Sequence, residues 1–110
     1  MRIDWQGIFP ALSTPCEENG ALDEASLRNE VLWNIDRGAH GVIASIMSGE
    51  FHKFSDAERM RTYEVVVEAA DGEVPVLVGP SHSGTEVVVK LAQHAQRVGA
   101  DGLVVLPPYF

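Results

Sequence analysis

The sequence has 110 residues, of which 45% are apolar and 22% charged, with a formal net charge of −8 and a pI of about 4.8. Its eight Lys and Arg residues argue against a nucleic acid or an anionic membrane as partner, because phosphate contacts need basic side chains. The length allows at most one domain, and the single cysteine excludes an internal disulfide. Because no apolar run reaches membrane-spanning length and residues 1–6 lack a signal core, we expect a cytoplasmic protein.

The first predicted elements are a short strand and a helix. Residues 7–12 are apolar, but Pro10 cannot donate to a ladder, so we expect a strand whose end bends into a site. A helix is then predicted after Asp23, a good N-cap, and Gly38 suits the left-handed residue that follows a helix end. Between these residues Leu27 and other apolar side chains recur at helical spacing.

A second strand and a second helix follow. Residues 41–44 form a continuous apolar run of the kind found in parallel sheets that are covered on both faces. After a turn at residues 45–50, Ser55 and Glu58 predict a capping box at the start of a helix. Gly72 is expected to end this helix.

The remaining residues predict one more helix between two strands. Residues 74–78 are the third predicted strand, and Ser83 and Thr85 are equally suitable N-caps for the third helix. Gly99 is expected to end that helix, and residues 103–106 form the fourth predicted strand.

This alternation predicts an α/β protein with a parallel sheet built from right-handed βαβ units. A Gly-Ala-x-Gly pattern at residues 38–41 recurs at residues 99–102, both times between a helix and a strand. Two architectures fit the pattern: an open doubly wound sheet, and part of a (β/α)₈ barrel of ~250 residues. No Gly-x-Gly-x-x-Gly or Gly-Lys-Ser/Thr phosphate loop is present to favour a nucleotide-binding sheet.

The turn at residues 45–50 is the principal candidate site, because ligands of α/β folds bind beyond the carboxyl ends of the strands. Ser48 offers a hydroxyl, and Gly49 beside it leaves backbone amides accessible, which suits an anion. A serine in such a turn also commonly bonds its own backbone, so the residue type alone leaves both interpretations open.

The other chemistry-bearing residues are dispersed. No two histidines have metal-ligand spacing on one helix, so we predict no metal, and no cofactor is expected. His82 follows the third strand and is a weaker candidate for the site, whereas Cys16 is expected to be a packed small residue. Glu50 is expected to cap nearby amides, and Thr14 to shape the mouth of the site.

Several motifs follow one another in the order of a known family. Residues 7–15 run from glycine through apolar residues to Thr-Pro, and residues 48–50 stand where the family has Gly-Thr-Thr-Gly-Glu. Residues 107–110 correspond to its Pro-Pro-Tyr-Tyr. Further matching segments lie at residues 54–59, 74–79 and 95–102. The chain therefore resembles the dihydrodipicolinate synthase / N-acetylneuraminate lyase family of class I, Schiff-base-forming 2-keto acid aldolases.

This resemblance implies a (β/α)₈ TIM barrel, with residues 1–110 as the N-terminal portion of a single barrel domain, about the first three and a half βα units. It also implies a small-molecule 2-keto acid substrate such as pyruvate, held as a Schiff base on a lysine of the sixth strand, beyond residue 110. Lys53 and Lys90 match no family motif and are not expected to be this nucleophile. A homo-oligomer, either a tetramer or a dimer, is the further expectation.

The resemblance assigns carboxylate binding to Ser48, with Met47, Gly49 and Phe110 also at the substrate, and a catalytic role to Tyr109. Met47 and Phe110 stand at a Thr and a Tyr of the family's proton relay, and neither side chain can relay a proton. We therefore expect that carboxylate binding is retained while proton handling differs. The substrate would then not be that of dihydrodipicolinate synthase. Packing at a strand end or a subunit contact is an equally plausible role for Tyr109.

Other functions remain compatible with the sequence. One is a non-catalytic barrel relative, or an incomplete fragment with no activity of its own. Another is an independent flavodoxin-like domain that binds a flavin or a phosphate. The sequence leaves open the second substrate and whether the reaction is cleavage, condensation or dehydration.

Overall fold

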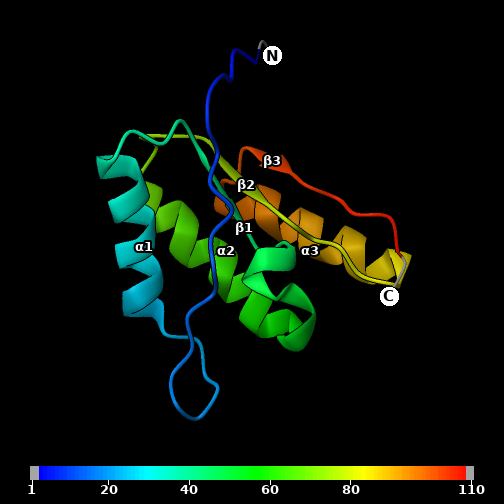
Figure 1. Cartoon of the computed structure of the whole chain (residues 1–110). Coiled ribbons are helices and arrows are strands. Elements are labelled where there is room, and N and C mark those ends of the chain that lie inside the picture. The colour runs from blue at the N-terminus through cyan, green and yellow to red at the C-terminus, as the bar shows by residue number, and fades with distance from the viewer. Residues whose placement is uncertain (1–2, 109–110) are drawn as a thin grey trace.

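The computed structural model describes residues 3–108, in which helices and parallel strands alternate (Figure 1). The predicted site residues Tyr109 and Phe110, which are the last two of the sequence, lie outside the described residues. The principal elements are α1 (Glu24–Asp36), β1 (Val42–Ala44), α2 (Asp56–Ala70), β2 (Val76–Val78), α3 (Thr85–Val98) and β3 (Gly102–Leu103).

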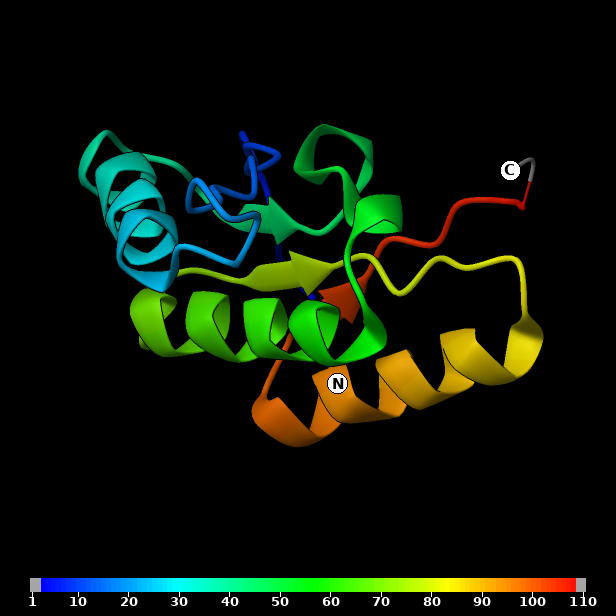
Figure 2. The same ribbon diagram turned by 90° about the horizontal axis from the view of Figure 1, so that it is seen from below.

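The three strands form one parallel sheet in the order β1-β2-β3. In the register, Val42 lies beside Val76, and Leu77 lies beside Gly102. The helices α1, α2 and α3 form a layer on one side of this sheet, with α2 in contact with both of the others (Figure 2). Helices on a single side are typical of a barrel segment, whereas a doubly wound sheet carries helices on both faces.

The predicted first strand is present only as an isolated parallel bridge between Ala11 and Ile43. Leu12 donates its N–H to the Ile43 carbonyl at 2.8 Å, and Ile43 donates to the Pro10 carbonyl at 2.9 Å. Pro10 has no N–H to return to β1, so the ladder is interrupted there. The segment nevertheless lies beside β1 and covers its outer edge.

The expected helix boundaries are largely confirmed. The Asp23 carboxylate accepts a hydrogen bond from the Ser26 N–H, and Ser55 and Glu58 form the full capping box. Gly38 and Gly99 adopt φ angles of 91° and 100° at the ends of α1 and α3, which explains the repeated glycine pattern.

The predicted cap of α3 was wrong. The N-cap is Gly84, and neither candidate side chain, Ser83 nor Thr85, caps the helix. Instead, the His82 Nδ1 accepts a hydrogen bond of 2.9 Å from the Gly84 N–H. This bond fixes the backbone just before the helix, and no side chain caps the first turn of α3.

The last strand, β3, is shorter than the strand predicted at residues 103–106, and it begins one residue earlier. The Val104 N–H still donates to the Val78 carbonyl at 2.9 Å, but the Leu106 N–H donates to the Ser81 hydroxyl at 2.8 Å. The hydroxyl of a serine in the loop after β2 thus takes the place of a backbone acceptor.

The core lies between the sheet and the helix layer. Leu27 and Val31 of α1, Val66 of α2 and Leu91 of α3 are all fully buried, together with the β1 residue Val42. Among residues 3–108, no helix combines the length and apolarity that a bilayer crossing requires.

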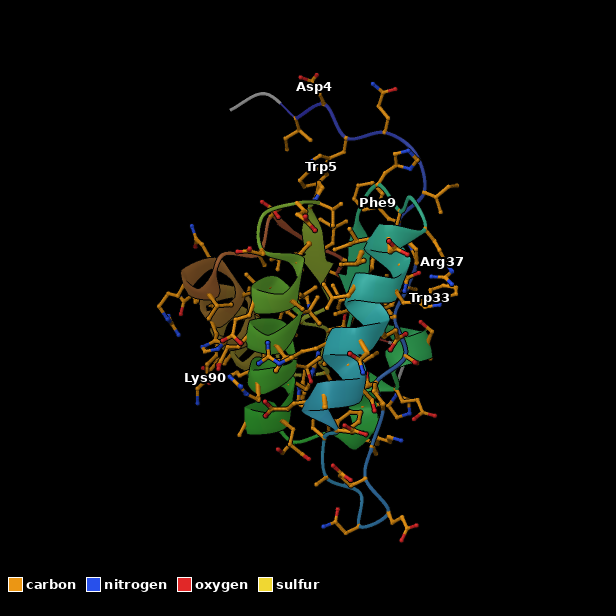
Figure 3. The ribbon with its side chains drawn as sticks, turned by 90° about the vertical axis from the view of Figure 1, so that its left-hand side faces the viewer. Asp4, Trp5, Phe9, Trp33, Arg37 and Lys90 are labelled. Atoms are coloured by element: carbon orange, nitrogen blue, oxygen red, sulfur yellow. The ribbon has the colours of Figure 1, made fainter. Side chains whose placement is uncertain are left out.

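An aromatic pair lies at the end of the sheet where the strands begin. Trp5 and Phe9 lie next to one another there, with ring centroids 6.1 Å apart (Figure 3). A Cβ atom built at Gly102 would lie 3.2 Å from the Trp5 ring, so this glycine lets the N-terminal segment approach β3. The opposite end, where the strands finish, carries the candidate site.

Candidate functional site

The turn after β1 consists of two short 3₁₀ segments, Met47–Gly49 and Phe51–Lys53. Ser45 begins the turn with a φ angle of 62°, and Glu50 joins the two segments with a φ angle of 53°. Non-glycine residues rarely adopt this left-handed conformation, which costs on the order of 1 kcal/mol each. The turn is therefore held in its shape by contacts with its surroundings.

Ser48 lies on the exposed surface of this turn, next to the exposed Met47. Its hydroxyl makes no hydrogen bond to the residues that the structure describes, so the alternative role, a serine that bonds its own backbone, is not observed. The neighbouring amides of Gly49 and Glu50 donate to the carbonyls of Ile46 and Met47, each at 2.9 Å. The expectation that these amides would be accessible to an anion was wrong, because they stabilise the 3₁₀ turn itself.

The end of the first segment supports the turn directly. The Thr14 hydroxyl donates a hydrogen bond of 2.8 Å to the carbonyl of the buried Gly49. A Cβ atom at Gly49 would lie 3.0 Å from that hydroxyl oxygen and 3.3 Å from the Leu12 carbonyl oxygen. Gly49 is thus required for close approach, and Thr14 shapes this part of the site as expected.

The β1 turn also lies directly against the end of β2. A Cβ atom at Gly79 would lie only 2.3 Å from the Ser45 carbonyl oxygen. The Gly79 carbonyl accepts two hydrogen bonds from α2, one of 2.8 Å from Arg59 Nη2 and one of 2.9 Å from the Tyr63 hydroxyl. Both side chains are buried, and burial is the main cause that raises the pKa of Tyr63, although Arg59 opposes it.

The two lysines are poorly suited to form a Schiff base. Lys53 forms an ion pair with Glu50, and this contact raises the pKa of the Lys53 ammonium group. A nucleophilic lysine needs a lowered pKa, so that part of it is neutral. Glu50 therefore pairs with Lys53 and does not cap amides as we had expected. Lys90 is exposed on α3, away from the turn (Figure 3).

The remaining candidate residues lie beside the second 3₁₀ segment: His82 lines a cavity with Phe51, and Cys16 lines one with Lys53. His82 is partly buried and uses its Nδ1 within its own loop, as described above. Cys16 is partly buried and contacts the Thr14 carbonyl at 3.6 Å. Among residues 3–108, no three His, Cys, Asp or Glu side chains gather as a metal site would require.

Arg59, Tyr63 and Ser81 were not among the predicted site residues. The first two donate to the Gly79 carbonyl, which lies against the Ser45 backbone, and the Ser81 hydroxyl accepts from the Leu106 N–H. A signal was available in the spacing of the second helix. Arg59 and Tyr63 are four residues apart and therefore share one helix face.

Comparison with known proteins places this geometry in a family. The sequence model of the "Dihydrodipicolinate synthetase family" matches residues 4–110. The chain belongs to this family. The resemblance noted above is therefore confirmed over almost all of its length.

Similar sequences in the family have several functions. An "Uncharacterized DapA-like lyase" of Rhizobium meliloti is 44% identical over 98% of this chain and 36% of its own length. A "4-hydroxy-tetrahydrodipicolinate synthase" of Bradyrhizobium diazoefficiens and a "Probable 2-dehydro-3-deoxy-D-pentonate aldolase YjhH" of Escherichia coli are each 40% identical. These cover 99% and 96% of this chain, and 36% and 35% of the relatives' own lengths. The chain thus spans about a third of the length of these relatives.

Solved structures agree on the fold. Dihydrodipicolinate synthase from Aquifex aeolicus superposes with a TM-score of 0.91 at 33% identity, over 96% of this chain and 36% of that structure. N-acetylneuraminate lyase from Mycoplasma synoviae superposes with a TM-score of 0.92 at 25% identity, over 96% of this chain and 37% of that structure. The described residues are thus part of a TIM barrel, and the doubly wound alternative is excluded.

Proposed function

We propose that the complete protein containing this chain is a lyase or aldolase acting on a 2-keto acid through a lysine Schiff base. Ser48 carries the proposal, because its exposed hydroxyl has no partner among the described residues and lies on the turn that ends a barrel strand. There it would donate to the substrate carboxylate, with Met47, Gly49 and Phe110 close by. Residues 1–110 would form the N-terminal portion of a single barrel domain.

The lysine that forms the Schiff base would lie beyond residue 110, on the sixth strand of the barrel. Family membership supports this placement, as does the raised pKa of Lys53, which favours its charged and unreactive form. Tyr109 is the proposed catalytic residue of this chain. The reaction needs neither a metal nor a cofactor, because the iminium nitrogen of the Schiff base itself withdraws electrons.

Borohydride reduction tests the proposal. The complete protein is incubated with pyruvate or another 2-keto acid and reduced, and its intact mass is measured. We expect a covalent adduct that disappears when the sixth-strand lysine is replaced by methionine. No adduct with any of several 2-keto acids would contradict the proposal and favour a non-catalytic barrel relative.

Ser48 is tested with two variants of the complete protein. Ser48→Ala removes the hydroxyl and is expected to raise the KM for the 2-keto acid about tenfold, since a hydrogen bond to a charged group is lost. Ser48→Thr keeps the hydroxyl and is the matched control, with a KM within about threefold of the wild type. An unchanged KM in Ser48→Ala would contradict the proposed role of Ser48 in binding the substrate carboxylate.

The substrate is proposed to differ from that of dihydrodipicolinate synthase. The support is the absence of a hydroxyl at Met47 and Phe110, where the family's relay has Thr and Tyr. The double variant Met47→Thr, Phe110→Tyr should therefore gain synthase activity. Robust synthase activity in the unmodified complete protein would contradict this part of the proposal.

We further propose a cytoplasmic homo-oligomer, a dimer or a tetramer. The single cysteine, which suits a reducing compartment, supports the location, and family membership supports the assembly. One similar solved protein is described as a "monomeric dihydrodipicolinate synthase variant", so the assembly needs measurement. Light scattering of the complete protein decides between dimer, tetramer and monomer, and a monomer would contradict the proposal.

A further inference from the structure

Arg59 is a buried cation. The residue is only 2% exposed, and its Nε has no hydrogen-bond partner among the residues that the structure describes. No ion pair links Arg59 to a carboxylate of the described residues. Because burying an unpaired charge is unfavourable, stability alone does not explain an arginine at this position.

The contacts of Arg59 reach both ends of the candidate turn. Its guanidinium group lies over the ring of Phe51, with 4.9 Å from Cζ to the ring centroid. Phe51 begins the second 3₁₀ segment, directly after the turn that carries Ser48. On its other side, Arg59 Nη2 donates to the Gly79 carbonyl, and Gly79 lies against the backbone of Ser45, where the turn starts.

Tyr63 holds the same carbonyl from a second direction. It lies one helical turn after Arg59, and its hydroxyl donates to the Gly79 carbonyl at 2.9 Å. Two donors from one rigid helix leave this peptide group little freedom to rotate. Because Gly79 packs against Ser45, the same contacts hold Ser45 in its left-handed conformation.

We propose that Arg59 is a positioning residue for the Ser48 turn. With Tyr63 it holds the Gly79 carbonyl, and with Phe51 it holds the end of the turn, so that Ser48 faces the substrate carboxylate. The buried Arg59 acts through the turn and does not touch the substrate. Its positive charge also favours an anion at this end of the sheet. This proposal rests on the proposed role of Ser48 in carboxylate binding.

The test compares Arg59→Met with Arg61→Met in the complete protein. Arg61 is on the same helix, but it pairs with Glu24 and Glu64 on the outer surface, so its loss is a matched control. Amide hydrogen exchange at Gly49 and Glu50 reports on the turn itself, since both amides are hydrogen-bonded within it. We expect exchange at least about tenfold faster in Arg59→Met and unchanged in Arg61→Met.

Kinetics provide the second measurement. Arg59→Met should raise the KM for the 2-keto acid about tenfold, with kcat changed by less than about threefold, because substrate binding is affected more than chemistry. Arg59→Lys keeps the charge and one donor and should restore part of the affinity. Unchanged exchange at the turn, or an equal KM in Arg59→Met and Arg61→Met, would overturn the proposal.

A further variant keeps the test decisive if Arg59→Met does not fold. Tyr63→Phe removes only the hydroxyl and should speed exchange at Gly49 and raise the KM about threefold. No change in either quantity would overturn the proposal. If the turn loosens as expected but the wild type forms no Schiff base, the positioning role stands and the proposed function fails.

Discussion

The start of the turn after β1 is enclosed, whereas the flank beside β3 is open. There Ser45 and Gly79 are buried against each other, and the Gly79 carbonyl accepts hydrogen bonds from two side chains of α2. Beside β3, Leu103 is 45% exposed and Val105 is 56% exposed, and a groove of about 340 Å³ lies between β3 and α3. In both regions a short parallel strand, β1 or β3, follows a helix and leads into a loop.

The difference between them comes from their neighbours. β1 has a partner on each side, the segment at Ala11 and the strand β2, and is covered by helices. Among the described residues β3 pairs only with β2, so its other edge is uncovered. Within the described residues, β1 is therefore supported on both sides and β3 on one. The predictions below test this contrast, and all of them concern the complete protein.

The largest effect is expected at Gly79. In Gly79→Ala the new methyl group would lie 2.3 Å from the Ser45 carbonyl oxygen, so the β1 turn must move. We expect a loss of about 3 kcal/mol or more in the free energy of unfolding, measured by urea denaturation. Gly84→Ala is the control, because its nearest contact would be 3.5 Å, and it should lose less than about 1 kcal/mol. Equal losses in the two variants would mean that the close approach of Gly79 to Ser45 does not contribute to stability.

The second prediction contrasts the enclosed and open faces of α3. Leu91 is fully buried, so Leu91→Ala should lose about 3 kcal/mol of stability. Val89 is 48% exposed at the groove, so Val89→Ala should lower the free energy of unfolding by less than about 0.5 kcal/mol. A loss above about 1 kcal/mol for Val89→Ala would show that further chain covers this groove in the complete protein.

A smaller effect is expected at Thr14. Thr14→Val keeps the shape of the side chain but leaves the Gly49 carbonyl without its donor, which should reduce stability by about 1 kcal/mol. Thr14→Ser keeps the hydroxyl and should lose less than about half as much. If urea denaturation gives the same stability for Thr14→Val and the wild type, the first segment does not support the turn.

The smallest effect concerns the ion pairs on the outer surface. Arg61 lowers the pKa of Glu64 and of Glu24 below the ordinary value of 4.5 through side-chain hydrogen bonds. Because the folded pKa values lie below the unfolded ones, this stabilisation is fully present above pH 4.5 and is lost as the pH falls through the folded values.

Arg61→Met should therefore lower the urea midpoint slightly at neutral pH, and the difference from the wild type should disappear in acid. Arg97→Met is the control, since Arg97 is exposed on α3 and forms no ion pair with the described residues. A difference for Arg61→Met that stays constant with pH would assign its effect to packing and not to charge.

Local patterns predicted most of the fold correctly. The caps Asp23 and Ser55 and the stop residues Gly38 and Gly99 lie where the sequence analysis expected them. These features depend on hydrogen bonds between residues close in sequence, so the amino acids themselves specify them. The edges of the sheet were less predictable, as the interrupted segment at Pro10 and the short β3 show.

The candidate site was predictable only in part. The position of Ser48 at a strand end followed from the sequence, and the structure shows its hydroxyl without a partner among the described residues. The spacing of Arg59 and Tyr63 places them on one helix face, but it does not show that Arg59 is buried, because an arginine is ordinarily on the solvent side of an amphipathic helix. Its burial depends on a carbonyl twenty residues away in the sequence.

The sequence by itself determined the alternation of helices and strands, the ends of the helices and the resemblance to one family, because short-range spacing and residue type specify them. Only the tertiary structure decided that all three helices lie on one side of the sheet and that Arg59 and Tyr63 meet the Gly79 carbonyl. Such contacts join residues that are distant in the chain, and their energy exists only once the strands and helices have packed together.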